Sequence, residues 1–307
     1  MEYAKHKPLL GPYSAGNLVL IRAVTSLHPG VGRSGEEVDL AVQRDNIGFP
    51  IIYASSIKGA LKSTIWRVDS RMANLLLGPE TEEEKFASAV GMLDGFLLAM
   101  PVRSLIGTYA FLTTPLLLQK FSEVIEFVEA VGVQGLGMLS ERIRETLKDF
   151  REIHRNSAVV SSSHRLKVES FGIIINEELQ LEPIEKASVE NLESVLGIEG
   201  GRLVVVNDDS GVVQINRGLI RATRVKLKRE TKTAEGGNLW TEEYIPHGTI
   251  FCTAFFYSRP FKAEGDIDSA EKVKDKVKEL LNSFGNYLII GGHETIGRGI
   301  VKLDLWD

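Results

Sequence analysis

Short apolar runs alternate with helical periodicity in the first half of the chain. The apolar and β-branched residues 17–25 predict a strand, and a second apolar run at 92–100 predicts another. A helix is predicted from about Pro115, and a charged helix is predicted over residues 140–150.

One further helix is predicted between the two strands. Apolar residues recur there every three or four positions up to Gly78, and Ser55 or Ser56 is expected to form the N-cap. Its buried face is expected to hold Ile57, Leu61, Ile65 and Val68.

Shorter extended segments dominate the chain after residue 151. The acidic residues 177–199 lie among them and predict surface helices and turns. Residues 269–285 predict an amphipathic helix, and residues 286–306 predict a strand, a glycine loop and a final strand. We expect the first and last strands in one sheet, because both flank glycine-bearing loops. Strands mixed with intervening helices indicate an α+β fold.

Two β-rich arms, RATRVKLKRETK and LWTEEYIPHGTIFCTAFFY, flank the segment AEGGN and predict a long hairpin that turns at the two glycines. The first arm and the residues before it are strongly basic. Such a hairpin is either a solvated edge guarded by lysines or an arm that contacts phosphate, and the residues leave both open. Trp240 and Tyr244 on the return arm would offer aromatic surfaces to bases.

Composition narrows the class of protein. The 307 residues are 43% hydrophobic and 25% charged, as in an ordinary globular protein, and the net charge is −5, so nucleic acid would need a local basic surface. The single cysteine, Cys252, excludes an internal disulfide and is predicted to be buried and inert. The start lacks the apolar core of a signal peptide, and no apolar run reaches the roughly 18 residues of a membrane span. A soluble, cytoplasmic protein with no membrane partner is expected.

Two glycine motifs invite a nucleotide interpretation. Gly30, Gly32 and Gly35 match GxGxxG, but no full helix follows, and the position about 20 residues on, where a dinucleotide fold places an acid, falls in Tyr-Ala-Ser-Ser. A dinucleotide enzyme is therefore disfavoured; it would be stabilised by its cofactor and would not bind RNA. The segment GGHETIGRG at 291–299 lacks the lysine and the helix of a P-loop. It is either a tight connection between strands or a bare backbone that approaches a sugar-phosphate chain beside Arg298.

Four stretches of the chain resemble a known family: residues 28–63, LLAMPVRSLIGTYAFLTTPLLL, LWTEEYIPHGTIF and GGHETIGRG. They are similar to the repeated backbone subunit of the type III-B CRISPR (Cmr) effector complex, in the RAMP superfamily. The resemblance implies a single RAMP-type domain over 1–307. It would have a palm like an RNA-recognition motif, or ferredoxin-like, with helical insertions at about 79–155 and a hairpin thumb at about 225–245.

The resemblance also implies a function. Identical subunits would form a filament on guide RNA with other Cmr subunits, and would cut target RNA at regular intervals, with the target 2′-hydroxyl as the nucleophile. It assigns catalysis to Asp39, His28, Glu242 and Tyr244. RNA contacts are expected at Ser56, Lys58, Gly59, Arg44, Lys226, Lys228, Gly292, Gly297, Arg298 and Gly299. A non-catalytic scaffold that coats RNA, with the nuclease in another subunit, is the alternative.

Asp39 is a weak base towards a sugar hydroxyl, because an ordinary aspartate has a pKa near 3.9. We therefore expect Asp39 to hold a divalent metal, Mg or Mn, that would lower the pKa of the hydroxyl and neutralise the phosphate. His28 would donate a proton to the leaving oxygen. If the glycine arch between His28 and Asp39 folds back, both side chains would face one phosphate.

Overall fold

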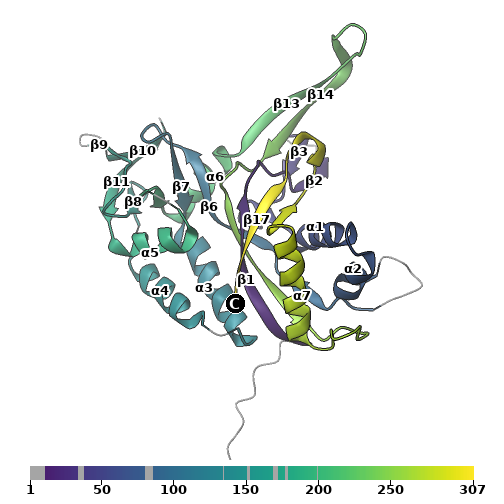
Figure 1. Ribbon diagram of the computed structural model, residues 1–307. Coiled ribbons are helices and arrows are strands. Elements are labelled where there is room, and N and C mark those ends of the chain that lie inside the picture. The colour runs from purple at the N-terminus through teal and green to yellow at the C-terminus, as the bar shows by residue number, and fades with distance from the viewer. Residues whose placement is uncertain are drawn as a thin grey trace, which may run out of the picture.

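The computed structural model describes residues 11–33, 38–79, 86–133, 135–150, 153–168, 172–176, 179–198 and 200–307. Within them the strands form a thirteen-stranded sheet and a four-stranded sheet, and helices pack against the larger one (Figure 1). The predicted α+β class is confirmed, while the ferredoxin-like arrangement of the palm stays a prediction.

The large sheet runs in the order β16-β17-β1-β15-β6-β7-β12-β8-β11-β10-β9, with β4 beside β6 and β5 beside β15. The strands are β1 (Tyr13–Ala23), β4 (Ile51–Ile52), β5 (Val90–Met92), β6 (Gly95–Arg103), β7 (Tyr109–Thr113), β8 (Ser157–Val160), β9 (Lys167–Val168), β10 (Gly172–Asn176), β11 (Leu179–Glu185), β12 (Leu203–Val205), β15 (Ile250–Ser258), β16 (Tyr287–Ile289) and β17 (Ile300–Trp306). As predicted, the first and last strands pair, with Leu18 opposite Trp306 and Ala23 opposite Val301.

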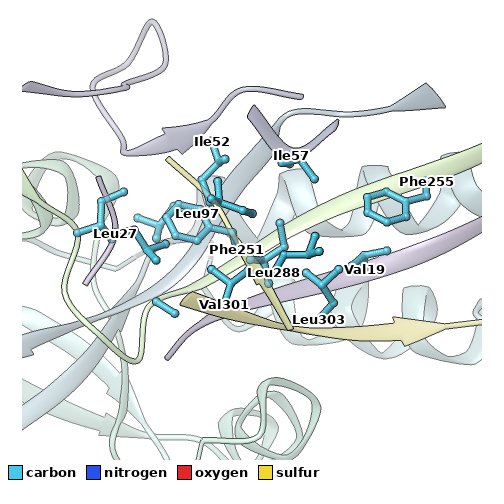
Figure 2. Packing of buried hydrophobic residues seen from close by; sticks show 14 of the residues in the cluster. Val19, Leu27, Ile52, Ile57, Leu97, Phe251, Phe255, Leu288, Val301 and Leu303 are labelled. Atoms are coloured by element: carbon cyan, nitrogen blue, oxygen red, sulfur yellow. The ribbon is translucent and has the colours of Figure 1, made fainter. Parts of the chain in front are cut away.

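Both faces of the sheet centre are buried, which explains why β1 and β15 are apolar at almost every position. Along β1, Val19 and Ile21 pack into one hydrophobic cluster, whereas Leu18 and Leu20 pack into the other. The first cluster is shown in Figure 2, where Val19 lies near Leu303 of β17.

Helices cover the two faces. The first cluster includes residues of α1 (Ala54–Trp66), α2 (Ser70–Leu77) and α7 (Ala270–Ser283), and the second includes residues of α3 (Pro115–Ala130), α4 (Gly137–Lys148) and α5 (Ala187–Leu196). The helix α6 (Asp208–Arg217) precedes the hairpin. The predictions of α3, α4 and α7 are confirmed, and Cys252 is buried, with burial raising the pKa of its thiol.

The single helix predicted up to Gly78 is wrong: α1 and α2 are separate, and Val68 between them is 68% exposed. Asp69 caps the second helix by accepting from the Met72 amide. No serine caps α1 with its side chain; the Ala54 amide instead donates to the Asp94 carboxylate at 2.7 Å. A cap supplied from 40 residues away leaves no local pattern to read.

The four-stranded sheet has the order β13-β14-β3-β2 and includes the protruding hairpin at the top of Figure 1. Its strands are β2 (Gly30–Arg33), β3 (Leu40–Val42), β13 (Ile220–Leu227) and β14 (Ala234–Tyr244). The hairpin is confirmed, but the turn predicted at the glycines is wrong. Those glycines belong to β14, and the turn spans 228–233, where the Lys228 amide donates to the Thr233 carbonyl. The strands β2 and β3 both come from the stretch at 26–50.

Two other regions differ from the pattern-based expectation. The acidic residues 177–199 include the strand β11 as well as the helix α5, and the helical part of the range 79–155 is confined to α3 and α4, since β5, β6 and β7 belong to the sheet. Gly35 of the GxGxxG motif lies outside the described residues. No helix in the described part of the chain is long and apolar enough to cross a membrane.

Candidate functional site

The strand β14 carries polar side chains on both of its faces where it enters the body of the protein. Trp240, Glu242 and Tyr244 alternate with Thr241 and Glu243, so the two sets point to opposite sides. Both glutamates are almost completely buried, at 2% and 1% exposure. Buried carboxylates are rare without partners, so the partners of each show what it does.

Glu242 is held mainly by neutral donors. The Tyr244 hydroxyl donates to its Oε2, and the Trp240 Nε1–H donates to its Oε1 at 2.6 Å. The Arg224 Nε lies 3.8 Å from Oε2, at the edge of ion-pair range. Burial raises the pKa of Glu242, but these donors, together with the charge of His293, outweigh burial and leave the pKa lowered.

Tyr244 lies between this carboxylate and two imidazoles. Its hydroxyl is 3.3 Å from Nδ1 of His293, and its ring centroid is 5.6 Å from that of His28. The guanidinium carbon of Arg298 lies 4.7 Å from the ring centroid, a cation–π contact. Burial raises the pKa of Tyr244, and its hydrogen bond to Glu242 adds to the effect.

The two imidazoles stack, with centroids 4.7 Å apart and planes inclined by 9°. His28 precedes β2, and His293 precedes the short 3-10 helix η1 (Glu294–Ile296) in the glycine loop between β16 and β17. The loop reaches His28 because the Gly292 amide donates to the His28 carbonyl at 3.0 Å. Gly291 allows this approach: its φ is +86°, and a Cβ there would lie 2.4 Å from the same carbonyl oxygen.

Asp39 lies apart from this cluster. Its Oδ2 accepts from the Thr241 amide at 2.7 Å and from the Thr241 hydroxyl at 3.0 Å, so it sits on the face of β14 opposite Glu242. The hydrogen bond from the Thr241 amide lowers the pKa of Asp39, with further contributions from the Thr241 hydroxyl and from the charge of Arg33. Among the described residues no hydrogen bond or ion pair joins Asp39 to His28, so their facing one phosphate stays a prediction.

Glu243 shares the face of Asp39 but has different partners. The Arg44 guanidinium bonds to its Oε2 at 2.8 Å, and Arg221 Nε lies 3.4 Å from its Oε1. Arg44 also donates to Asn216 at 2.9 Å and to the Val42 carbonyl at 3.0 Å. These bonds direct the Arg44 side chain into the protein. Its contact with RNA stays a prediction, and an internal role as the partner of Glu243 is the alternative.

The other residues expected at RNA lie in three places. Ser56, Lys58 and Gly59 lie in the first turns of α1, where burial and then the charge of Lys62 lower the pKa of Lys58. Lys226 and Lys228 are exposed near the tip of the hairpin. In the glycine loop, Gly292 and Gly297 are exposed.

Gly299 is buried, and a Cβ on it would lie 2.6 Å from the Ile290 carbonyl oxygen. This position needs glycine for the fold of the loop.

Among the described residues, no group of three or more His, Cys, Asp or Glu side chains could hold a metal ion. Glu36 and Glu37, close to Asp39 in the chain, lie outside the described residues. Mg²⁺ in proteins commonly binds one or two carboxylates together with substrate phosphates and water. A single carboxylate such as Asp39 fits that donor set, because both hydrogen bonds from Thr241 engage Oδ2 rather than Oδ1.

Sequence reasoning placed His28, Glu242 and Tyr244 in one site, and the structure brings them together. It missed His293, although GGHETIGRG was singled out for its glycines. The base-stacking surface expected from Tyr244 is wrong, because that ring is 1% exposed. Pairing of the first and last strands was the available signal, since it sets Gly291 beside His28.

Comparison with known proteins extends over both sheets. A family model described as the RAMP superfamily matches residues 20–302. The CRISPR system Cmr endoribonuclease Cmr4 of Pyrococcus furiosus is 32% identical over 302 residues, covering 94% of this chain and 95% of that protein. A chain in the cryo-EM structure of the type III-B Cmr-beta bound to cognate target RNA matches with a TM-score of 0.80 and 29% identity, over 96% of this chain and 98% of that one. The crystal structure of oligomeric Cmr4 from Pyrococcus furiosus matches with a TM-score of 0.64 and 26% identity, over 95% and 98%.

Proposed function

The chain belongs to the RAMP superfamily, and from that premise we propose that it is the repeated backbone subunit of a type III-B Cmr complex. In this role, copies of the chain coat a guide RNA as a filament, together with other Cmr subunits, and cut complementary target RNA at regular intervals. The relatives support each part: one is named as an endoribonuclease, one comes from a complex with target RNA, and one is oligomeric. We place this activity in the cytoplasm.

The observation that carries the proposal is the cluster of proton-exchanging groups at the base of a basic hairpin. Glu242, Tyr244, His28 and His293 contact one another, and Arg224 and Arg298 lie beside them. The hairpin above them exposes lysine and arginine side chains in a protein whose net charge is −5. A local basic surface of this kind is what binding to a phosphate backbone requires.

Cleavage needs no external nucleophile when the 2′-hydroxyl of the target attacks its own adjacent phosphate. When the nucleotide is held with this hydroxyl in line with the leaving oxygen, the activation barrier is lower by several kcal/mol, because the entropy of alignment is already lost on binding. The products are a 2′,3′-cyclic phosphate and a 5′-hydroxyl. Arg298, whose guanidinium lies over the Tyr244 ring, is the cation we propose for binding the phosphate.

Asp39 is the residue we propose for holding a divalent metal, Mg or Mn, between the protein and the target phosphate. A metal bound there would lower the pKa of a nearby hydroxyl and neutralise charge on the phosphate. The lowered pKa of Asp39 keeps the carboxylate charged at neutral pH, which suits a cation ligand.

Asp39→Asn in a reconstituted complex tests this function. The substitution keeps a carbonyl acceptor for Thr241, so assembly and guide binding are expected to be unchanged, whereas target cutting is expected to be lost. The measurement is the mapped ends of a labelled target, with the wild-type complex as control. Cyclic-phosphate ends spaced by one subunit should appear only with Asp39 present.

Cutting retained at all sites by the Asp39→Asn complex contradicts the catalytic role. If the wild-type complex binds guide and target without cutting, the chain is a scaffold and the nuclease lies elsewhere. A salt-dependent RNA-binding titration separates both from a dinucleotide enzyme, which would show no RNA affinity.

A further inference from the structure

His293 differs from the other groups of the cluster in being both anchored and accessible. Its side chain is 27% exposed, and its Nδ1 lies 3.5 Å from Oε2 of Glu242 and 3.3 Å from the Tyr244 hydroxyl oxygen. Tyr244 gives its one hydroxyl proton to Glu242, and a carboxylate only accepts, so Nδ1 carries the proton in these contacts. The Nε2 of the ring is therefore the nitrogen with the free lone pair.

A carboxylate that fixes the tautomer of a histidine in this way leaves the opposite nitrogen as a proton acceptor. The backbone supports the same orientation. His293 has a φ of +68°, a conformation that non-glycine residues seldom adopt, and its carbonyl accepts from the amides of Ile296 and Arg298. The loop thus holds the imidazole over the buried cluster while 27% of the side chain stays exposed.

His28 has no comparable freedom. It is 6% exposed, and its Nδ1 lies 2.8 Å from the Glu243 carbonyl, which can only accept, so Nδ1 donates there. Its Nε2 faces Gly30 so closely that a Cβ on that glycine would lie 2.8 Å away. One ring face is covered by His293. In this arrangement His28 offers an RNA oxygen far less access than His293, whose side chain is 27% exposed.

The charges around His293 favour its unprotonated form. Burial lowers its pKa; the negative charge of Glu242 opposes this, and the positive or ionisable groups His28, Arg224 and Arg298 reinforce it. These groups lie on β14, on the segment before β2, on β13 and on the glycine loop itself. At neutral pH the ring is therefore ready to accept a proton rather than to donate one.

We infer that His293 is the group that accepts the proton of the attacking 2′-hydroxyl, and that His28, whose ring stacks on that of His293, is a positioning residue. The inference rests on the proposed function and deepens it. In the step, the 2′-O–H proton moves to Nε2 of His293, the O2′–P bond forms and the P–O5′ bond breaks. The leaving O5′ takes a proton from water, and His293 returns its proton to solvent, so the cyclic phosphate and 5′-hydroxyl form without net consumption of water.

His293→Asn tests the assignment. Asparagine tolerates the left-handed backbone, and its amide nitrogen can keep the bond towards Glu242, but it has no basic nitrogen. Cleavage by the reconstituted complex is expected to slow by about 10²- to 10⁴-fold, the usual range for loss of a general base. The rate that remains should no longer fall at acid pH, because the titrating group is gone. Guide and target affinity should be unchanged.

Glu294→Gln is the matched control in the same loop. Its carboxylate makes an exposed ion pair with Arg67, and the variant is expected to cut at the wild-type rate with the wild-type pH profile. An inactive control would show that any change in the loop stops cutting, and would overturn the assignment.

Glu242→Gln supplies an independent measurement. The negative charge of Glu242 raises the pKa of His293, so its removal should move the acid limb of the rate profile to lower pH. If the His293→Asn complex fails to assemble, this shift still tests the inference. An acid limb that moves to lower pH supports the inference, and an acid limb that does not move overturns it. If the wild-type complex cuts and Asp39→Asn does not, but His293→Asn cuts at the wild-type rate and profile, the inference fails while the proposed function stands. If the wild-type complex does not cut, the proposed function itself fails.

Discussion

Glu242 and Glu243 are neighbours on one strand, almost equally buried, and yet they are held in opposite ways. Glu243 faces two arginines, one of them at 2.8 Å, whereas Glu242 faces a phenol, an indole and an imidazole, with an arginine only at 3.8 Å. Glu243 is paired with guanidinium groups, which do not exchange protons, and we interpret it as a structural residue. Glu242 contacts a phenol and an imidazole, which do exchange protons, and we interpret it as part of the proton-transfer site.

The same contrast separates Glu242 from Asp39. Among the described residues Asp39 is held by Thr241 on the other face, and both bonds from Thr241 to its carboxylate engage Oδ2. The strand β14 thus divides the site into a face that moves protons and a face that offers a carboxylate to a cation. The variants below test this division on the isolated full-length chain.

Arg44→Met should have the largest effect on stability. It removes the nearest partner of Glu243 while filling much of the same space, and leaves that buried carboxylate with Arg221, whose side chain is 58% exposed. Breaking a buried ion pair from one side costs about 3 to 5 kcal/mol. We expect a loss of about 3 kcal/mol in the free energy of unfolding, measured by urea denaturation.

The double variant Arg44→Met with Glu243→Gln is the control, because it removes the stranded charge as well. Its loss should be smaller than the sum of the two single losses. An Arg44→Met chain as stable as the wild type but weaker in RNA affinity would instead identify Arg44 as an RNA contact and refute its internal role.

Glu242→Gln should have a smaller effect with a distinctive pH dependence. The amide keeps the shape but no longer accepts from both Tyr244 and Trp240 as a charged group, a loss of roughly 1 to 3 kcal/mol at neutral pH. The wild-type carboxylate has a lowered pKa in the fold, so its contribution is present above the unfolded value of 4.5 and is lost as pH falls through the folded value.

The measurement is the free energy of unfolding at a series of pH values. Wild type should lose stability on acidification below pH 4.5 more steeply than Glu242→Gln, and the difference between the two should narrow. A constant difference across this range would show that Glu242 is not ionised in the fold, and the contrast with Glu243 would then rest on packing alone.

Local pattern predicts the elements well and their junctions poorly. The continuous apolar run of β1 and the apolar stripe of α7 are visible in the sequence, because burial is continuous along the strand and periodic along the helix. The break between α1 and α2 is not visible, because the helical spacing of apolar residues continues through it although Asp69 caps a second helix there. The hairpin turn was misplaced for a related reason: the pairing of Glu242 with Leu40 helps to fix its register, and that contact spans about 200 residues.

The site shows the same limit. His28, Glu242 and Tyr244 were named from residue type and family resemblance. That Asp39 contacts Thr241 rather than these three could not be predicted, because which face of β14 a partner touches depends on a contact between distant strands. His293 was invisible for the opposite reason. The sequence of its loop predicts a glycine turn. Only the pairing of Gly291 with His28 shows that this turn places the His293 imidazole in the site.

Thr241→Val should have the smallest effect on stability and still report on the division of the site. It removes the hydroxyl donor to Asp39 while keeping the amide donor, the larger cause of the lowered pKa. Because Asp39 is solvated, we expect no measurable change in the urea midpoint, but the pKa of Asp39, followed by carboxyl NMR, should rise towards its ordinary value. The pKa values of Glu242 and His293 should not move, since both lie across the strand. A change in either pKa would mean that the two faces of β14 are electrostatically coupled.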